Sequence, residues 1–214
     1  MKKRIRFRWI SMAVGIAFLL WMPAPASAIY GGKGAEKDDI ERKPTQVKLH
    51  DPTLVDQDGK KVKFASDVVG DRFVVIDTFY TTCTQICPIL SAIFMDLQDL
   101  LGSRQGREVV LVSLTVDPVT DIPPRLKEYA QTWNARPGWL FLGGEKLKVD
   151  QVLEGLGLYA PDFTAHPAMF LVGDGKNGTW TRFYGFASPE QILERIEELS
   201  AERQVKAGSS KKGM

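Results

Sequence analysis

The sequence contains few of the residues that form disulfides or bind soft metals. It has two cysteines and two histidines among 214 residues. A chain of this length can bury a sufficient hydrophobic core, so it does not depend on disulfides for folding, unlike small disulfide-rich secreted domains. The sulfur chemistry of this protein therefore rests on Cys83 and Cys87.

A strong excess of positive charge is also lacking. The chain has 28 Lys and Arg residues against 26 Asp and Glu residues. Five of the basic residues and none of the acidic ones lie in the first 28 residues, so the remaining 186 residues carry 23 basic against 26 acidic side chains. The small positive charge belongs to the N-terminal segment, and no nucleic-acid partner is expected.

The N-terminal segment has the pattern of a secretory signal. Basic residues between Lys2 and Arg8 precede the apolar residues 9–22, and Ala26-Ser27-Ala28 offers a cleavage site after Ala28. The apolar stretch is shorter than the roughly 20 residues that span a bilayer. No cysteine follows it, which excludes lipid attachment there. The sequence predicts a signal peptide over residues 1–28 and a periplasmic protein, with membrane contact only through an uncleaved signal or a membrane-bound partner.

The rest of the chain is predicted to form one domain between two unstructured segments. Residues 29–45 are charged, contain glycine and have hardly any apolar side chain, which is typical of a flexible linker. Residues 203–214 are predicted to form a disordered tail. The domain then covers residues 46–202, and we find no internal repeat in it.

Hydrophobic patterns in this domain predict alternating strands and helices. Residues 53–56 and 61–64 flank an Asp-Gly pair, which predicts a hairpin. Buried strands are predicted at residues 73–79, 108–116 and 168–172, the last with a hairpin partner at 179–184. Helices are predicted from Pro88 to Gly102, at 125–133 with Asp121 as the cap, at 149–156 and at 189–199. This order predicts an α/β fold with a thioredoxin-like mixed β-sheet sandwiched by helices and an N-terminal β-hairpin.

The two cysteines lie at the turn between the first buried strand and the helix after it. Side chains four residues apart lie on one face of a helical turn, about 5–6 Å apart at Cβ, so the two sulfurs could share a metal or close a disulfide. Free N–H groups at a helix start favour the thiolate. A purely stabilising disulfide is the alternative, but so short a loop restricts the unfolded chain least.

Two further residues are candidates for the same site. His166 precedes the third buried strand and would lie near the cysteines, and two thiolates with one imidazole suit Cu(I). A lone histidine is more often structural, and that alternative stays open. Asp77 interrupts a buried strand, so burial should raise its pKa and let it relay a proton to a thiol. Alternatively, Asp77 hydrogen-bonds a buried group. His50 is interpreted as a surface residue.

Four motifs in order resemble the Sco/SenC family of copper-binding, thioredoxin-fold proteins: DTFYTTCTQICP, VSLTVDPVTDIPPRLKEYA, AHPAMFLVGDG and GFASPEQIL, between about residues 54 and 199. The resemblance implies that Cys83, Cys87 and His166 are copper ligands, for Cu(I) and possibly Cu(II). It implies copper delivery and thiol maintenance in the assembly of the copper centre of cytochrome oxidase. The partners would be a copper-accepting respiratory protein and a periplasmic thiol reductant. Asp117 and Asp121 match aspartates of the family, with turn and cap roles as the alternative.

The sequence departs from the family pattern at several positions. Thr84 and Gln85 replace the proline and aspartate that the family often has between its cysteines, and Ala165 replaces an acid before the histidine. Asp77 falls where thioredoxins carry a buried acid. Pro167 falls where they have a cis-proline, so we predict a cis bond between His166 and Pro167.

These observations leave three functions open. The first is a periplasmic protein that binds and delivers Cu(I) or maintains the thiols of a respiratory copper centre. The second is a thiol-disulfide oxidoreductase in which Cys83, Cys87 and Asp77 are catalytic and no metal is transferred. The third is a binding module with a stable disulfide. A peroxiredoxin is not expected, because the Pro-x-x-x-Thr-x-x-Cys pattern is absent around Cys83.

Overall fold

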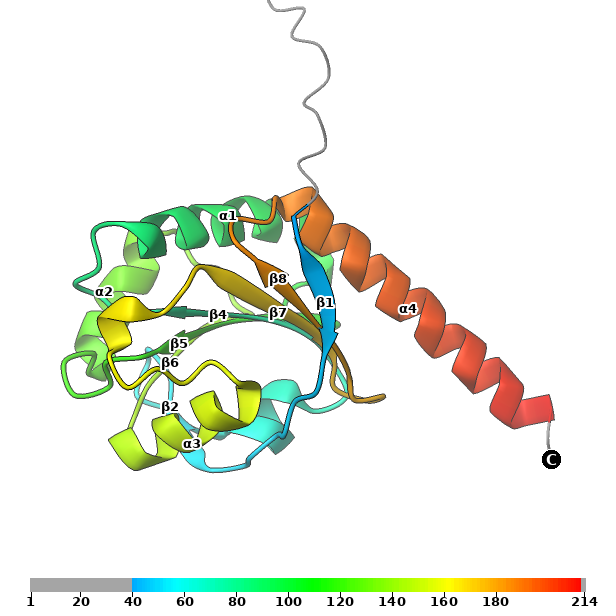
Figure 1. The fold of residues 1–214 in the computed structure, drawn as a ribbon, viewed down its shortest axis with the longest axis horizontal. Helices are drawn as coiled ribbons and strands as arrows, with labels where there is room; N and C mark the ends of the chain where they lie inside the picture. The colour runs from blue at the N-terminus through cyan, green and yellow to red at the C-terminus, as the bar shows by residue number, and fades with distance from the viewer. Residues whose placement is uncertain (1–39, 213–214) are drawn as a thin grey trace, which may run out of the picture. The chain divides into compact units, whose positions relative to one another are not determined.

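The structure is a computed structural model of the chain, and it describes residues 40–212. The predicted signal peptide, most of the predicted linker and residues 213–214 lie outside this range. The described residues form a six-stranded mixed sheet with helices on both faces (Figure 1). The predicted fold class is confirmed.

The sheet has the order β1-β8-β7-β4-β5-β6. Three neighbouring strands are parallel: β4 (Phe73–Phe79), β5 (Val109–Thr115) and β6 (Trp139–Leu142). On the other side of β4 the pairing is antiparallel, through β7 (Met169–Asp174), β8 (Thr179–Tyr184) and β1 (Arg42–Thr45). Every residue of β4 and β5 is buried, as expected for continuous apolar strands in a sheet that is covered on both faces.

Different elements cover the two faces of the sheet. One face packs against α1 (Ile86–Leu101), α2 (Pro123–Thr132) and α4 (Pro189–Lys212). The other packs against α3 (Lys146–Leu156), the hairpin of β2 (Thr53–Val55) and β3 (Lys61–Lys63), and the π-helix η2 (Phe64–Val69). The predicted N-terminal hairpin is thus confirmed. Two 3-10 turns, η3 (Gly102–Arg104) and η4 (Phe163–Ala165), complete the described elements.

Two expectations about the elements are wrong, and one strand was missed. Residues 42–45, predicted to be part of a flexible linker, form β1, because their backbone pairs with β8 although their side chains are not apolar. The last helix continues to Lys212 rather than ending at Leu199, so residues 203–212 are not a disordered tail. These residues are mostly good helix formers, which extends the helix. Strand β6 was not predicted at all.

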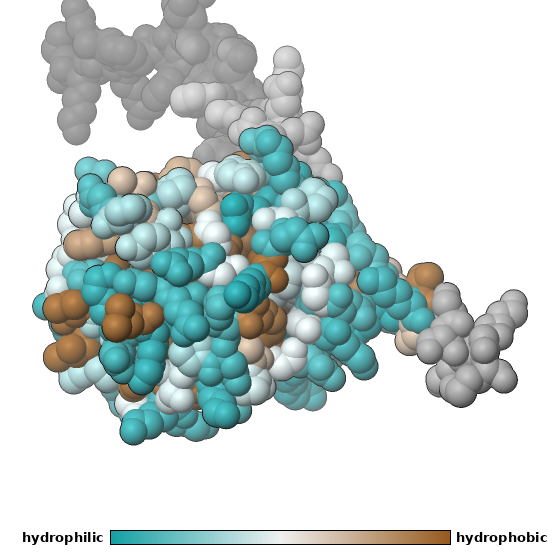
Figure 2. Space-filling model, turned by 60° about the horizontal axis from the view of Figure 1, so that its bottom comes forward, coloured by the Kyte–Doolittle hydropathy of each residue, from teal (hydrophilic) through white to brown (hydrophobic). Residues whose placement is uncertain are grey.

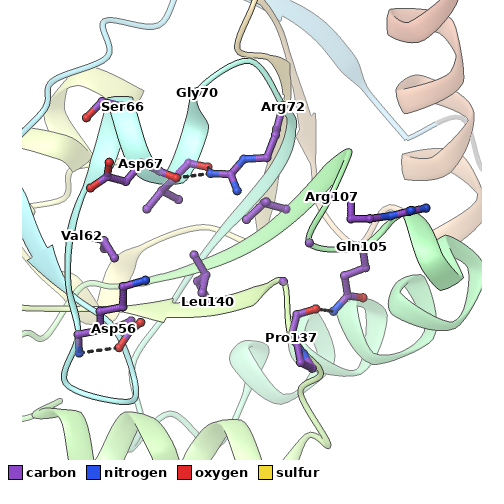
Figure 3. A pocket seen from close by; sticks show the side chains of 15 residues that line it. Asp56, Val62, Ser66, Asp67, Gly70, Arg72, Gln105, Arg107, Pro137 and Leu140 are labelled. Atoms are coloured by element: carbon purple, nitrogen blue, oxygen red, sulfur yellow. Dashed lines mark hydrogen bonds between the residues drawn. The ribbon is translucent and has the colours of Figure 1, made fainter.

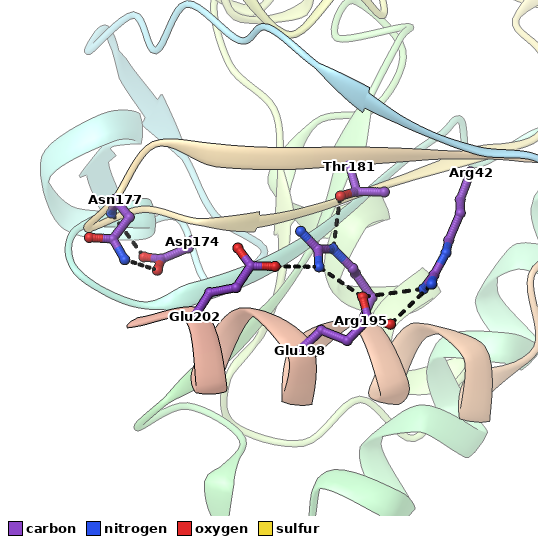
Figure 4. Close-up of polar contacts among 7 residues, drawn as sticks. All are labelled: Arg42, Asp174, Asn177, Thr181, Arg195, Glu198 and Glu202. Atoms are coloured by element: carbon purple, nitrogen blue, oxygen red, sulfur yellow. Dashed lines mark hydrogen bonds and ion pairs between the residues drawn. The ribbon is translucent and has the colours of Figure 1, made fainter. Parts of the chain in front are cut away.

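Charged side chains connect α4 to the sheet (Figure 4). Arg195 donates to Thr181 Oγ1 on β8 at 2.9 Å and to Glu198 and Glu202 at 2.8 and 2.9 Å. Arg42 on β1 reaches Glu198 at 3.0 Å. The edge strand and the long helix are therefore joined through one shared carboxylate.

In the described residues, the most apolar helix packs into the core of the domain, and the apolar side chains at the surface are scattered. One helical stretch, Ile86–Arg104, is long and apolar enough to cross a membrane, but its residues Leu90, Phe94 and Leu97 are fully buried in the core of the domain. Figure 2 shows hydrophilic side chains over most of one face of the molecule, with hydrophobic ones in small separate groups. Scattered groups of this kind are ordinary for a protein surface.

Candidate functional site

The two cysteines lie where β4 ends and α1 begins. Cys87 is the second residue of α1, and its backbone N–H donates to Cys83 Sγ at 3.4 Å. Both thiols are free. Cys87 is fully buried, whereas Cys83 is 8% exposed. Cys83 is therefore the thiol that a partner molecule reaches first.

The surroundings shift the pKa values of the two thiols in opposite directions. Burial by itself disfavours the Cys83 thiolate, but hydrogen bonds from the Cys87 thiol and from the backbone N–H groups of Gln85 and Cys87 outweigh it and lower the pKa of Cys83. Burial raises the pKa of Cys87, and the neighbouring Cys83 raises it further. Cys83 is thus the nucleophilic thiol of the pair.

His166 completes the predicted group of three. It follows η4 and is 3% exposed. Its Nε2 lies 3.8 Å from Cys87 Sγ, and its Nδ1 lies 3.3 Å from Thr78 Oγ1. Burial lowers the pKa of His166, partly opposed by a hydrogen bond with the Pro167 backbone. The imidazole is therefore held neutral, the form that binds metals.

Cys87 Sγ and His166 Nε2 are separated by the distance typical of two ligands of one metal ion. A sulfur at about 2.3 Å and a nitrogen at about 2.0 Å from one ion, as in zinc sites, stand roughly 3.5–3.8 Å apart. Cys87 and His166 already have this separation. Within residues 40–212, no three His, Cys, Asp or Glu side chains yet surround a common metal position. Two thiols and an imidazole form a donor set that fits a soft metal ion.

The predicted cis bond before Pro167 is wrong. The described part of the chain, residues 40–212, contains no cis peptide bond. His166 has φ −64° and ψ 132°, the extended conformation that a following proline favours. This ordinary backbone already places the imidazole beside Cys87, so no cis bond is needed.

Asp77 is a buried carboxyl group below the cysteines. It is fully buried on β4, and neither of its oxygens has a hydrogen bond of normal geometry. Burial raises its pKa to about 7, and the hydroxyl of Ser113 opposite on β5 offsets this only in part. The expected rise is confirmed. The charge of Asp77 contributes to the raised pKa of Cys87, which places the two groups near each other.

Asp121 connects the cysteine turn to the end of β5. Its carboxylate accepts both the N–H and the hydroxyl of Thr81, two residues before Cys83, and the hydroxyl of Thr115. The cap of α2 is Ile122, without a side-chain hydrogen bond, so the predicted cap role of Asp121 is wrong. Asp117 makes the turn before it, since its carbonyl accepts Asp121 N–H at 2.9 Å.

Comparison with known proteins agrees with this fold. The model of the SCO1/SenC family matches residues 41–201. The chain belongs to the SCO1/SenC family. A SCO1 protein homologue of Bacillus subtilis (strain 168) is 33% identical over 102 residues, which cover 47% of this chain and 51% of that protein. The match therefore spans about half the length of this relative.

Two Sco structures share the fold of this SCO1/SenC chain. BsSco, described as having a disulfide switch and as a member of the Sco family of cytochrome c oxidase assembly proteins, aligns with a TM-score of 0.62 at 24% identity, covering 74% of this chain and 96% of BsSco. Bradyrhizobium japonicum ScoI with copper bound aligns with a TM-score of 0.59 at 21% identity, covering 72% and 99%. At these identities the likeness shows the fold alone.

A groove of the SCO1/SenC domain lies away from the cysteines (Figure 3). It has a volume of about 1020 Å³ and is lined by the hairpin, the end of η2 and the turns before β5 and β6. Arg72 donates to the carbonyls of Asp67 and Val68 within η2, so its charge serves that helix end. No cysteine or histidine lines the groove. The cysteine turn is therefore separate from this groove.

Sequence reasoning predicted three candidate ligands and Asp77 but missed the residues that contact them. Thr78 and Tyr80 lie in the same motif as Cys83, yet nothing in their residue types marks them. Tyr80 packs edge-on against the His166 ring, with centroids 5.8 Å apart, and against Phe163 at 5.3 Å. These contacts join the cysteine turn to the segment that carries His166.

Proposed function

We propose that this protein binds Cu(I) through Cys83, Cys87 and His166 and delivers it to a respiratory copper centre such as that of cytochrome c oxidase, or maintains the thiols of that centre. The proposal includes a periplasmic location, which the basic and apolar N-terminal pattern supports. The partners are a copper-accepting respiratory protein and a periplasmic thiol reductant. Relatives described as copper-bound or as assembly proteins support this role.

One observation carries the proposal: Cys87 Sγ and His166 Nε2 stand 3.8 Å apart, beside the Cys83 thiol. Two thiolates and a neutral imidazole are soft or borderline donors, and a small number of such donors suits Cu(I). Asp77, the carboxyl group below the pair, is fully buried. Thiolate and imidazole donors favour a soft cation over a hard one.

The same residues determine how cargo enters and leaves. Cys83 carries the accessible sulfur and the lower pKa, so it makes the first and the last contact with the ion. The Cys87 thiol, whose pKa burial raises, gives up its proton when it becomes a ligand. Transfer to a partner then proceeds by exchange of ligands at Cys83, the side that solvent reaches.

A thiol-disulfide oxidoreductase is the second candidate, supported by the unequal thiols and by Asp77. In that reaction the Cys83 thiolate attacks a partner disulfide to form a mixed disulfide, and Cys87 then attacks Cys83 to release the partner as a dithiol. Asp77 would accept the Cys87 proton. This chemistry uses no imidazole, which separates the two candidates experimentally.

The decisive variant is His166→Ala, tested on the reduced protein in competition with a chromogenic Cu(I) chelator. We expect the dissociation constant for Cu(I) to rise at least tenfold, because the soft donor that completes the site is lost. The rate of reduction of a model disulfide should stay within about twofold of the parent rate, since the thiols are untouched.

The matched control is His50→Ala, which removes the other histidine. His50 lies at α3, where its Nδ1 contacts Gln151 at 3.3 Å, and it does not contact the cysteines. The control should bind Cu(I) like the parent. Parent-like affinity in His166→Ala would exclude the three-ligand site, and unmeasurable Cu(I) binding by the parent with rapid disulfide exchange would favour the oxidoreductase.

A further inference from the structure

The two ring nitrogens of His166 face different groups. Nε2 faces the Cys87 sulfur at 3.8 Å, and Nδ1 faces Thr78 Oγ1 at 3.3 Å. Thr78 is 2% exposed and lies on β4, which is paired on both sides within the sheet. The hydroxyl is therefore held on a central strand of the sheet, whereas His166 lies in a connecting segment.

Only one arrangement of hydrogens in this contact leaves Nε2 able to bind a metal. A neutral imidazole carries one proton, and its other nitrogen offers the lone pair. If Nδ1–H donates to Thr78 Oγ1, the lone pair of Nε2 faces Cys87. If instead the hydroxyl donates to Nδ1, the Nε2–H faces the sulfur and blocks ligation. Histidines that bind metals commonly donate their other N–H to a neighbouring acceptor.

We propose that Thr78 is a positioning residue of the copper site, whose hydroxyl accepts the Nδ1–H of His166 and so keeps Nε2 free toward Cys87. The identity of the metal rests on the proposed function, whereas the hydrogen arrangement is a property of the metal-free protein. The edge-on ring of Tyr80 restricts the imidazole from a second side.

The first measurement is the ¹⁵N NMR signature of the His166 ring in the reduced, metal-free protein. The chain has two histidines, so the His50→Gln background leaves the signals of His166 alone. We expect a protonated Nδ1 and an unprotonated Nε2. Thr78→Val, which replaces the hydroxyl by a methyl group of similar size, should give a mixture of both tautomers.

The second measurement is Cu(I) affinity by chelator competition for the same variants. Thr78→Val should raise the dissociation constant about tenfold, the lower end of the effect of removing a partner of a metal-binding histidine. Thr78→Ser keeps the hydroxyl and should restore both the tautomer and the affinity. Thr181→Val is the matched control, because Thr181 is also a buried sheet threonine with one side-chain hydrogen bond, to Arg195, outside the site.

The two measurements distinguish a failure of the inference about Thr78 from a failure of the proposed function. A protonated Nε2 in the parent protein overturns the inference, and so does a Thr78→Val variant with the parent's tautomer and affinity. A loss of affinity shared by Thr181→Val, or a loss that Thr78→Ser does not restore, assigns the effect to the fold and also overturns it. If no variant or parent binds Cu(I), the proposed function fails while the tautomer still decides the role of Thr78.

Discussion

Two buried aspartates near opposite ends of β4 are treated very differently by this fold. Asp77, below the cysteines, has no hydrogen bond of normal geometry, and burial raises its pKa to about 7. Asp174 ends β7 opposite Phe73 and is 1% exposed. It accepts the N–H groups of Lys176 and Asn177 at 2.9 and 3.0 Å, the Asn177 amide and the Arg203 guanidinium. Burial raises the pKa of Asp174, but these donors outweigh it and leave the pKa low.

The number of hydrogen-bond donors around each carboxyl group explains the difference between Asp77 and Asp174. A buried carboxylate whose donors are all in place is permanently charged and ties its neighbours together. A buried carboxyl without donors is ready to gain or lose a proton near neutral pH. The fold therefore supplies donors to the carboxylate where α4 joins the sheet and leaves the carboxyl group below the thiols without them.

The largest effect is expected for Asp77→Asn. The folded pKa of Asp77 lies above its ordinary value of 3.8, so the stability it contributes is fully present below that value and is lost as the pH rises through about 7. The parent should therefore lose about 4 kcal/mol more of its free energy of unfolding between pH 4 and pH 8 than the variant, which cannot ionise there. Urea unfolding of both proteins at the two pH values measures the difference. Equal losses would show that the folded state supplies Asp77 with hydrogen-bond donors, as it does Asp174.

The second effect is expected for Asp174→Ala at pH 7. The change removes a charged partner of Arg203 and the acceptor for the turn after β7, so we expect the free energy of unfolding to fall by about 3 kcal/mol. In the parent, the low folded pKa means that this stability is present above pH 3.8 and is lost as the pH falls below it. Urea unfolding at pH 7 tests the change. A loss under about 1 kcal/mol would mean that the donors around Asp174 do little more than offset its burial.

The smallest effect on the free energy of unfolding is expected at an exposed ion pair, which serves as a reference for the two buried aspartates. Lys127 lies 3.0 Å from Asp58, and both side chains are more than half exposed. Lys127→Ala should change the free energy of unfolding at pH 7 by less than about 0.5 kcal/mol, because water screens the pair and alanine favours the helix. The same unfolding measurement applies. A loss near that of Asp174→Ala would show that burial does not explain why the aspartates and this exposed pair differ in their effect on stability.

Local sequence patterns determined most of the secondary structure. The apolar run at residues 73–79 and the helical spacing after Pro88 predict β4 and α1, and with them the cysteine turn. The four family motifs predict the donor residues, and the structure brings Cys87 and His166 together as expected. The raised pKa of Asp77 also followed from the sequence, because a carboxyl group in a continuous apolar strand must be desolvated.

Tertiary structure alone decided the rest. The pairing of β1 with β8 depends on neighbours far along the chain, and the trans bond before Pro167 depends on a choice between allowed backbones. The same holds for the links from Asp121 to Thr81 and from Thr78 to His166, which are 40 and 88 residues apart in sequence. Hydrophobic periodicity reports which side of an element is buried, whereas the partner of each polar atom is set by where distant elements meet.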